Sequence, residues 1–169
     1  MHMENNKSVA GRYSQLESHR HSFLERARDA SELTIPTLIP PSGHTGSTIY
    51  KTPYQSVGAR GVNNLASKLL MALLPPNSPF FRLSIDDFDI ESMAGKDARG
   101  AVEEALARIE RAGMQEIEGS AVRVPIHEAL KQLIVAGNSL IYLPKEGGMK
   151  VFRIDRYVVK RDTMGNVME

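Results

Sequence analysis

The sequence contains no cysteine and no tryptophan, and only 6% of its 169 residues are aromatic. Without cysteine, disulfides, thiolate metal sites and cysteine nucleophiles are impossible, which fits a reducing compartment. No long apolar run occurs either, and charges such as Lys7, Arg12 and Glu17 interrupt residues 1–30, so neither a signal peptide nor a membrane span is predicted. Because the formal net charge is only +1, charge alone neither indicates nor excludes a nucleic-acid partner.

The composition is otherwise that of an ordinary globular protein, with 41% hydrophobic and 24% charged residues. A chain of this length fits one domain and should bury roughly 70% of the surface that its unfolded form exposes. The sequence has no internal repeats and no low-complexity tracts. We therefore expect one hydrophobic core that needs no covalent or metal cross-link.

Hydrophobic residues recur at helical spacing in several stretches, so we predict about four helices. The first begins at Ser8, which can act as an N-cap, and it is followed by a proline-rich segment at 35–46 that we expect to be an exposed arm or loop. Two further prolines, at positions 75 and 76, must end the second helix. The predicted helices span approximately residues 8–30, 54–73, 97–118 and 126–134.

A period of two, typical of strands, replaces the helical pattern beyond Asn138. Two apolar runs at 139–144 and 149–154 flank a pair of glycines, which is typical of a hairpin, and 156–162 is a third strand candidate. An earlier run at 80–85 also alternates and predicts a half-buried strand. The predicted class is therefore α+β, mostly helical with a small, mainly antiparallel sheet. Since a sheet cut after the third candidate would leave an unpaired edge, we expect the chain to be the N-terminal piece of something longer.

Three patterns resemble ligand-binding motifs, and each is incomplete. His127 and Glu128 begin the zinc-protease pattern H-E-x-x-H, but Lys131 stands in place of the second histidine and, as a cation, cannot bind the metal. The segment "VGARGVNN" lacks the third glycine of a dinucleotide loop and the Gly-Lys-Ser/Thr of a phosphate loop. Four carboxylates lack the glycine and the final glutamate of a calcium loop, so we expect them to face solvent: Asp86, Asp87, Asp89 and Glu91.

The remaining histidines are His2, His19, His21 and His44, and no nucleophilic triad follows from their spacing. His19 and His21 are two residues apart and so do not share a helix face. We therefore predict no catalytic residue, no metal site and no cofactor.

Several small or polar residues are interpreted as structural: Gly58, Gly61, Asn63, Asn64, Gly137 and Asn138. The first two glycines lie on the apolar face of the second predicted helix, where we expect another helix to approach closely. One of the two neighbouring asparagines is expected to hydrogen-bond a backbone group. The glycine after the fourth helix is expected to take the left-handed conformation that ends a helix, which the following asparagine also tolerates.

Basic residues outnumber acidic ones near the end of the chain, at Lys145, Lys150, Arg153, Arg156, Lys160 and Arg161. A basic sheet face of this kind can contact DNA phosphates or a neighbouring subunit. We favour the alternative of a solvated strand face whose lysines deter edge aggregation, because no aromatic interleaving suggests base stacking.

Taken in order, four segments resemble the N-terminal part of the head-to-tail connector, or portal protein, of short-tailed bacteriophages: "LTIPTLIPP", "TPYQSVGARGVNNLASKLLMALLPPNSPFFRLSI", "EALKQLIVAGNSLIYLP" and "YVVKRDTMGNV". The subgroup that carries its own single-subunit RNA polymerase is the most similar. The resemblance runs from Tyr13 to Val167 and covers roughly the first third of a family member, which corresponds to the wing. It therefore implies a flexible leader at 1–12 and a wing-like portion at 13–169, without stem, clip or crown.

The resemblance implies a structural virion protein, not an enzyme, located at the portal vertex of the capsid and in the host cytoplasm during assembly. Implied partners are further copies of the subunit in a ring, usually a dodecamer, together with the packaging motor (terminase), a tail adaptor, and capsid and scaffolding proteins. Double-stranded DNA passes through the ring during packaging and ejection, and no small-molecule substrate or cofactor is implied, since ATP hydrolysis belongs to the separate motor.

Two rival hypotheses remain open on the sequence. One is a stand-alone nucleic-acid-binding module that uses the basic face at 145–161, and the other is an enzyme fragment whose active groups lie beyond Glu169. Since the resemblance does not include the stem that closes a portal ring, we expect this chain alone to be monomeric or weakly associated.

Overall fold

The computed structural model describes residues 8–76, 78–85 and 99–169. Within these ranges it contains five α-helices and a two-stranded antiparallel sheet, which confirms the predicted α+β class. No helix of the described residues is long and apolar enough to cross a bilayer. In chain order the elements are α1 (Val9–His19), α2 (His21–Leu33), α3 (Val57–Leu73), α5 (Arg99–Gly119), α6 (Arg123–Ala136), β1 (Leu140–Tyr142), β2 (Lys150–Phe152) and the 3-10 helix η2 (Ile154–Arg156).

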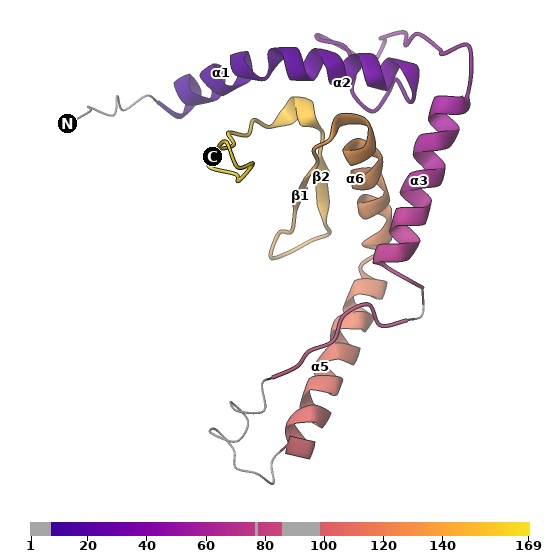
Figure 1. Cartoon of the computed structure of the whole chain (residues 1–169), viewed down its shortest axis with the longest axis vertical. Coiled ribbons are helices and arrows are strands. Elements are labelled where there is room, and N and C mark those ends of the chain that lie inside the picture. The colour runs from indigo at the N-terminus through magenta and orange to yellow at the C-terminus, as the bar shows by residue number, and fades with distance from the viewer. Residues whose placement is uncertain (1–7, 77, 86–98) are drawn as a thin grey trace, which may run out of the picture.

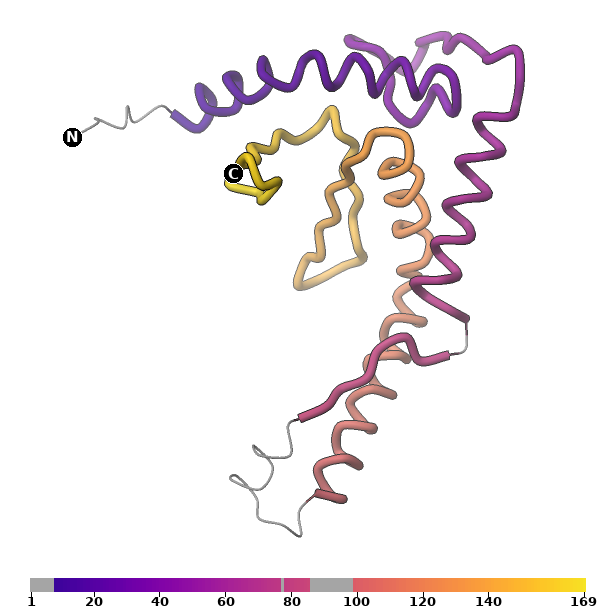
Figure 2. Tube along the Cα trace, in the orientation of Figure 1, coloured from indigo at the N-terminus to yellow at the C-terminus, as the bar shows by residue number. Residues whose placement is uncertain are grey.

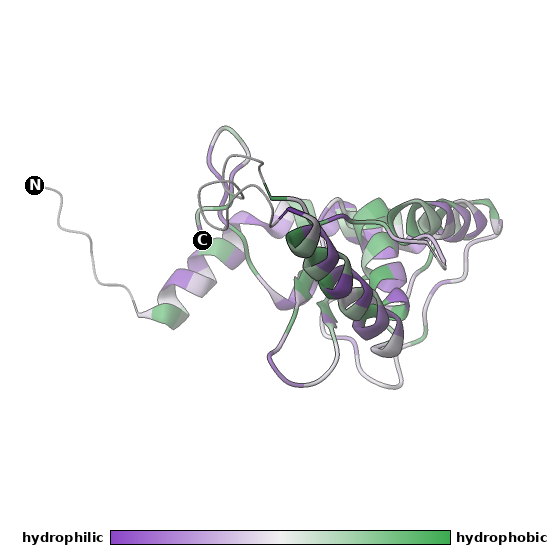
Figure 3. Ribbon diagram, turned by 90° about the horizontal axis from the view of Figure 1, so that it is seen from below, coloured by the Kyte–Doolittle hydropathy of each residue, from purple (hydrophilic) through white to green (hydrophobic). Residues whose placement is uncertain are grey.

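The arrangement is elongated (Figure 1). Helices α1 and α2 lie end to end across one end of the molecule, α3 runs alongside α6, and α5 extends away from the far end of that pair. The helices carry both hydrophobic and hydrophilic residues, as the alternating green and purple along them show (Figure 3). In α2, α3 and α6 this amphipathic pattern accompanies buried residues, whereas α1 and α5 have none.

The first predicted helix is interrupted, which accounts for one helix more than expected. Arg20 has φ −84° and ψ −4° and separates α1 from α2, although hydrogen bonds from Arg20 N to Leu16 O (3.2 Å) and from Leu24 N to Arg20 O (2.9 Å) continue across the break. The Arg20 guanidinium donates to the carbonyl oxygens of Ile154, Asp155 and Tyr157. A contact so distant along the chain is invisible to local periodicity.

Helix α1 begins within the range assigned to the leader. Ser8 is its N-cap, and the Ser8 hydroxyl accepts a hydrogen bond from Gly11 N at 3.3 Å. Residues 9–12 are therefore helical, while residues 1–7 lie outside the described part of the chain. Arg12 forms an ion pair with Glu169, so the start of α1 lies beside the C-terminal segment (Figure 2).

The hydrophobic core forms where α2, the proline-rich segment, the end of α6 and η2 meet. Its buried members are Leu24, Ala27, Leu38, Ile39, Ala136 and Ile154. The expectation of a wholly exposed arm at 35–46 is therefore wrong for its first half, and Pro40 is also fully buried. The prolines prevent a helix in this segment, so its backbone groups lack helical hydrogen-bond partners. The Ser31 hydroxyl supplies partners for two of them, because it donates to Ile35 O (2.8 Å) and accepts from Ile39 N (3.1 Å).

Helices α3 and α6 form the second packed unit. Small residues are buried on both helices, Ala66 on α3 and Ala129 on α6, and small side chains allow two helix backbones to approach closely. Arg123, in the first turn of α6, donates to the carbonyl oxygens of Leu74 and Pro75. These bonds satisfy carbonyls that are left without partners where the prolines end α3.

The predicted strand at 80–85 is not a strand. The segment runs along α5, where Leu83 N donates to Glu110 Oε1 at 2.6 Å and the half-buried Phe81 ring lies next to Gly113 (Figure 1). A Cβ added to Gly113 would lie 3.3 Å from Phe81 Cζ. Within the described residues, the neighbour of this segment is the helix α5 and not another strand. The alternation of apolar and polar residues at 80–85 therefore does not lead to a sheet.

The predicted hairpin is confirmed, with register Leu140↔Phe152, Ile141↔Val151 and Tyr142↔Lys150. The third strand candidate does not join this sheet. Residues 154–156 form η2 instead, and beyond them Arg161 makes an isolated bridge to Val167. The turn of η2 directs the chain away from the hairpin before it can pair.

Candidate functional site

The basic residues predicted as one sheet face lie on separate parts of the structure. Lys145 and Lys150 belong to the hairpin, Arg153 and Arg156 flank or end η2, and Lys160 and Arg161 lie in the C-terminal segment. The three lysines are exposed and, within the described part of the chain, their ammonium groups have no hydrogen-bond or ion-pair partner. The three arginines, in contrast, each contact an acceptor or a carboxylate within the protein.

Arg153 is bound within the molecule. Its Nε and Nη2 atoms donate to the two carboxylate oxygens of Asp155 at 3.1 and 3.0 Å, and the Asp155 carboxylate also lies 3.7 Å from Arg156 Nε. A bidentate pair of this kind fixes the guanidinium and occupies the donors that a phosphate would need. Arg156, whose side chain is 61% exposed, is more open to solvent than Arg153, whose side chain is 27% exposed.

Arg161 connects the C-terminal turn to the end of α6. Its two Nη atoms donate to Gly165 O and to Asn138 Oδ1, both at 2.8 Å. Asn138 is therefore the acceptor of a long-range bond, and it does not adopt the left-handed conformation that asparagine tolerates. Because the two residues are 23 positions apart, no local pattern predicted this pair.

Asp162 organises the turn that follows Arg161. Its carboxylate accepts hydrogen bonds from Asn166 Nδ2 (2.9 Å), Asn166 N (2.8 Å) and Met164 N (2.9 Å). The bonds from Asn166 are the largest cause that lowers the pKa of Asp162 below its ordinary value of 3.8. The residues that follow Asp162 thus form a turn, which the Asp162 side chain stabilises.

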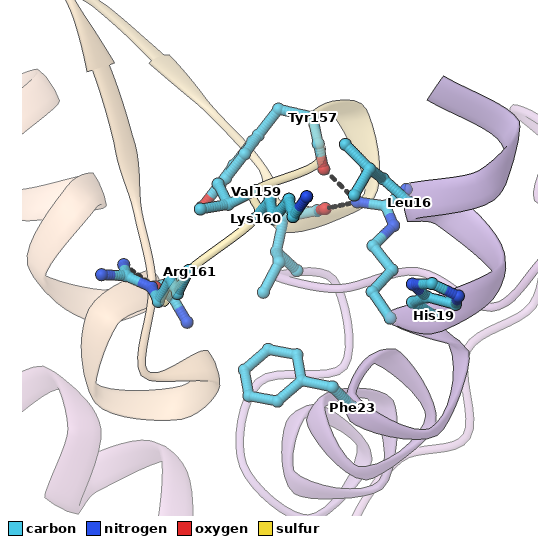
Figure 4. A pocket seen from close by; sticks show the side chains of 10 residues that line it. Leu16, His19, Phe23, Tyr157, Val159, Lys160 and Arg161 are labelled. Atoms are coloured by element: carbon cyan, nitrogen blue, oxygen red, sulfur yellow. Dashed lines mark hydrogen bonds between the residues drawn. The ribbon is translucent and has the colours of Figure 1, made fainter. Parts of the chain in front are cut away.

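A cavity of about 390 Å³ lies between the junction of α1 with α2 and the C-terminal segment (Figure 4). In the figure Leu16, His19 and Phe23 come from the helical side, and Tyr157, Val159, Lys160 and Arg161 come from the opposite side. Its complete lining is Leu16, His19, Arg20, Phe23, Asn138, Ile154, Tyr157, Val159, Lys160 and Arg161. Sequence reasoning considered these residues separately and missed the cavity, because its two walls are more than a hundred positions apart in the chain.

The cavity combines positive charge with an apolar surface. Burial raises the pKa of Tyr157, and the nearby charges of Arg161 and Arg20 oppose that rise. Within the described residues the Tyr157 hydroxyl and Arg20 Nε are buried without a hydrogen-bond partner. Such groups are uncommon in folded proteins, and here both belong to residues that line the same cavity.

The glycines of α3 have different surroundings. A Cβ at Gly58 would lie 2.6 Å from Leu33 O, so the end of α2 approaches the helix too closely for any side chain. The close approach expected at Gly61 is absent, since a Cβ there would meet no atom within 4 Å. The buried face of α3 includes Val62, and one residue along a helix turns the side chain by about 100° away from that face.

Asn63 and Asn64 are exposed, and in the described part of the chain neither amide forms the hydrogen bond that was expected of one of them. Gly137 has φ +71° and ψ −2°, the left-handed conformation, and its N–H donates to Leu133 O at 2.8 Å. This is the ending of α6 that the sequence indicated.

The incomplete zinc-protease motif lies at a contact between helices. His127 Nε2 on α6 is 3.3 Å from Ser67 Oγ on α3, and Lys131 pairs with Glu128 at 2.7 Å. Among the described residues no group of three or more histidine, aspartate or glutamate side chains could hold a metal ion. The acidic cluster at 86–91 lies outside the described residues.

The sequence of the chain can be compared with those of known proteins. Residues 6–169 match the family described as "Bacteriophage head to tail connecting protein". The chain belongs to this family. It is 44% identical over 162 residues to the portal protein of Enterobacteria phage T3 and 44% identical over 163 residues to that of Escherichia phage T7, each match covering 93% of this chain. It is also 34% identical over 152 residues to the portal protein of Pseudomonas phage phiKMV.

The chain spans only part of these connector-family relatives. The matched region is 30% of the length of the T3 and T7 portal proteins and 29% of the phiKMV protein. The similarity thus places this chain in a family of structural phage proteins, and it concerns less than a third of a complete portal subunit.

Proposed function

We propose that this chain is the wing portion of a phage portal protein, the subunit of the ring through which double-stranded DNA is packaged and ejected. The observation that carries the proposal is the 44% identity to two portal proteins over 93% of the chain. The incomplete motifs support a structural role as well, because His127, Glu128 and Lys131 serve helix packing and surface pairing. We propose no catalysis by this chain.

Exposed apolar residues around the connection from α2 to α3 also support assembly with other protein. Large hydrophobic side chains in this region are more than two-thirds exposed: Leu33, Ile49, Tyr54 and Val57. Exposed aromatic side chains such as Tyr54 are enriched in protein interfaces. In our proposal they meet neighbouring subunits in a ring, a dodecamer by family resemblance, as part of the complete portal protein.

The other proposed partners follow from the same role. As part of a portal vertex the wing would lie within the virion near capsid and scaffolding proteins, and the complete subunit would meet the packaging motor and the tail adaptor. The complete subunit would assemble in the host cytoplasm before it becomes a virion component. Double-stranded DNA would pass through the channel without requiring a base-specific site on the wing.

A chimaeric portal protein tests the proposed function. This chain would replace the matched segment of the T7 portal protein, and the chimaera would be supplied to a T7 phage that lacks its portal gene. We expect closed rings and restored plaque formation. A matched chimaera with the T3 segment is the control, and failure of our chain where the T3 segment succeeds would contradict the proposal.

The structure weakens the alternative of a nucleic-acid-binding module, because Arg153 and Arg161 are engaged within the molecule. Binding of duplex DNA that weakens steeply with salt and disappears in the double variant Lys150→Glu, Arg153→Glu would nevertheless favour that alternative. Hydrolysis of ATP by the pure chain would instead favour an enzyme and contradict a purely structural role.

A further inference from the structure

The outer edge of the β-hairpin has no partner strand in the described part of the chain. The sheet consists of β1 and β2, and β2 lies between β1 and α6 (Figure 1). In an antiparallel pair, about half of the backbone N–H and C=O groups of each strand point away from the partner strand. Within the described residues, no hydrogen bond joins Leu140–Tyr142 to a group on the side away from β2. This row of polar backbone groups can pair with another strand.

The side chains along β1 are exposed on both faces of the sheet. Leu140 and Tyr142 lie on one face and are 39% and 52% exposed, and Ile141 and Leu143 lie on the other and are 43% and 69% exposed. A helix or a second sheet packed over the hairpin would cover only one of these pairs. A strand beside β1 contacts side chains on both faces. Exposure on both faces therefore favours an added strand.

This edge also lacks the residues that normally keep an edge strand from pairing. Charged side chains and prolines on edge strands prevent the association of one sheet edge with another. Residues 140–143 are three aliphatic residues and a tyrosine, and Pro144 and Lys145 come only after them, toward the turn. An apolar edge of this kind is an aggregation hazard unless another strand covers it.

The exposed surface is too small to hold a separate protein. Covering the exposed parts of all four side chains would bury roughly 400 Å² on this chain, whereas stable complexes bury about 800 Å² per partner. A segment of the same polypeptide needs less surface, because its linkage can keep it near the edge at a millimolar effective concentration. More than two-thirds of the T3 and T7 portal proteins lies outside the region that this chain matches. A portal subunit of that length has ample chain to supply the segment.

We propose that an extended segment from the unmatched part of the same portal subunit pairs with the outer edge of β1 and makes the hairpin a three-stranded sheet. The inference rests on the proposed function, because it requires the remainder of a portal subunit. The segment has apolar side chains on both faces, which lie beside residues 140–143. It has no proline at the paired positions, since proline cannot donate a hydrogen bond to the ladder.

Amide hydrogen exchange followed by mass spectrometry tests the proposal. It compares the 169-residue chain with the chimaera that joins this chain to the remainder of the T7 portal protein. In the chain alone, the β1 amides that point away from β2 should exchange at nearly the rate of an unstructured peptide. In the chimaera we expect them to exchange about tenfold more slowly or less, in monomers as well as in rings. The exposed turn at 145–148 is the internal control and should exchange rapidly in both proteins.

A matched pair of variants links the protection to β1 itself. Tyr142→Glu places a carboxylate opposite Lys150, with which it can form a cross-strand ion pair, so the hairpin should persist in the chain alone. In the chimaera the same carboxylate opposes an apolar strand and should speed the exchange of the β1 amides by roughly tenfold. Val9→Glu adds the same charge at the exposed start of α1 and should change β1 exchange by less than about twofold.

Four results would overturn the proposal. The first is slow exchange of all β1 amides in the chain alone, and the second is unchanged protection in the Tyr142→Glu chimaera. The third is protection in rings but not in monomers, which would assign the edge to a neighbouring subunit. The fourth is a chimaera that closes into rings without any slowing of β1 exchange, which would leave the proposed function intact.

Failure of the proposed function has a different signature. The chimaera would then remain monomeric while the control with the T3 segment forms rings. Exchange of the β1 amides in that monomer would still distinguish a paired edge, which supports the proposal, from an open edge, which contradicts it.

Discussion

Arg20 makes several hydrogen bonds between the N-terminal helices and the C-terminal segment, and replacing it with methionine tests how much those bonds stabilise the fold. The guanidinium donates to the carbonyl oxygens of Ile154, Asp155 and Tyr157, and the side chain is only 12% exposed. Methionine retains an apolar stem of similar length but supplies no donor. The substitution therefore removes the hydrogen bonds with little change in packing.

The magnitude follows from the geometry. A hydrogen bond from a charged donor contributes about 1.5–3 kcal/mol when its partner is buried. Because one guanidinium shares its donors among several carbonyls and water can reach part of this surface, we expect a total loss of about 3 kcal/mol in the free energy of unfolding. For a chain of this size each kcal/mol changes the melting temperature by about 2–4 °C, so Arg20→Met should melt roughly 6–12 °C lower.

Thermal unfolding followed by far-UV circular dichroism measures this difference. Arg26→Met is the matched control, because Arg26 lies on α2, which begins directly after Arg20, is exposed and has no hydrogen-bond or ion-pair partner in the described part of the chain. The free energy of unfolding of that variant should differ from that of the parent by less than about 0.5 kcal/mol. Equal melting temperatures for the two variants would show that Arg20 does not hold the C-terminal segment against the helices.

Five other substitutions, at four positions, test local features. Gly137→Val should lower the free energy of unfolding by about 1–2 kcal/mol, because φ at this position is +71°. Gly137→Asn should lower it less, because asparagine tolerates this conformation. Equal melting temperatures for the parent chain and both variants would contradict the capping role. Gly58→Ala should destabilise the chain, because the added Cβ would lie 2.6 Å from a backbone oxygen. Gly61→Ala, whose added Cβ would meet no atom within 4 Å, should stabilise the chain by up to about 1 kcal/mol. A Gly58→Ala variant that is more stable than the parent in denaturant titrations would refute the close contact. Asp162 has a lowered pKa, so its stabilising effect is present above the unfolded pKa and is lost as the pH falls through the folded pKa. Asp162→Asn should therefore melt lower than the parent near neutral pH, and the difference should shrink once the pH falls well below 3.8; a pH-independent difference would exclude this origin.

Sequence periodicity predicted the elements that are stabilised locally. Prolines 75 and 76 and the amphipathic spacing before them placed α3, and Gly137 marked the end of α6. The hairpin followed from two apolar runs around a glycine pair. In each of these cases the residues that determine the structure are neighbours in the sequence.

The failures have a common physical origin in contacts between distant residues. Arg20, at the break between α1 and α2, bonds to carbonyl oxygens beyond residue 150, and Leu83 in the segment at 80–85 bonds to Glu110 on α5. Arg161, predicted as part of an open basic face, instead donates to Asn138, 23 positions earlier in the chain. The cavity could not be predicted for the same reason, since neither of its walls contains a motif by itself.

Cryo-electron microscopy of the chimaeric portal tests most directly whether this chain is a portal wing. We expect a closed ring in which the helices α1, α2, α3 and α6 occupy density at the outer edge of every subunit, away from the channel. Rings that show this fold lining the channel, or a chimaera that remains monomeric while the T3 control closes, would contradict the assignment.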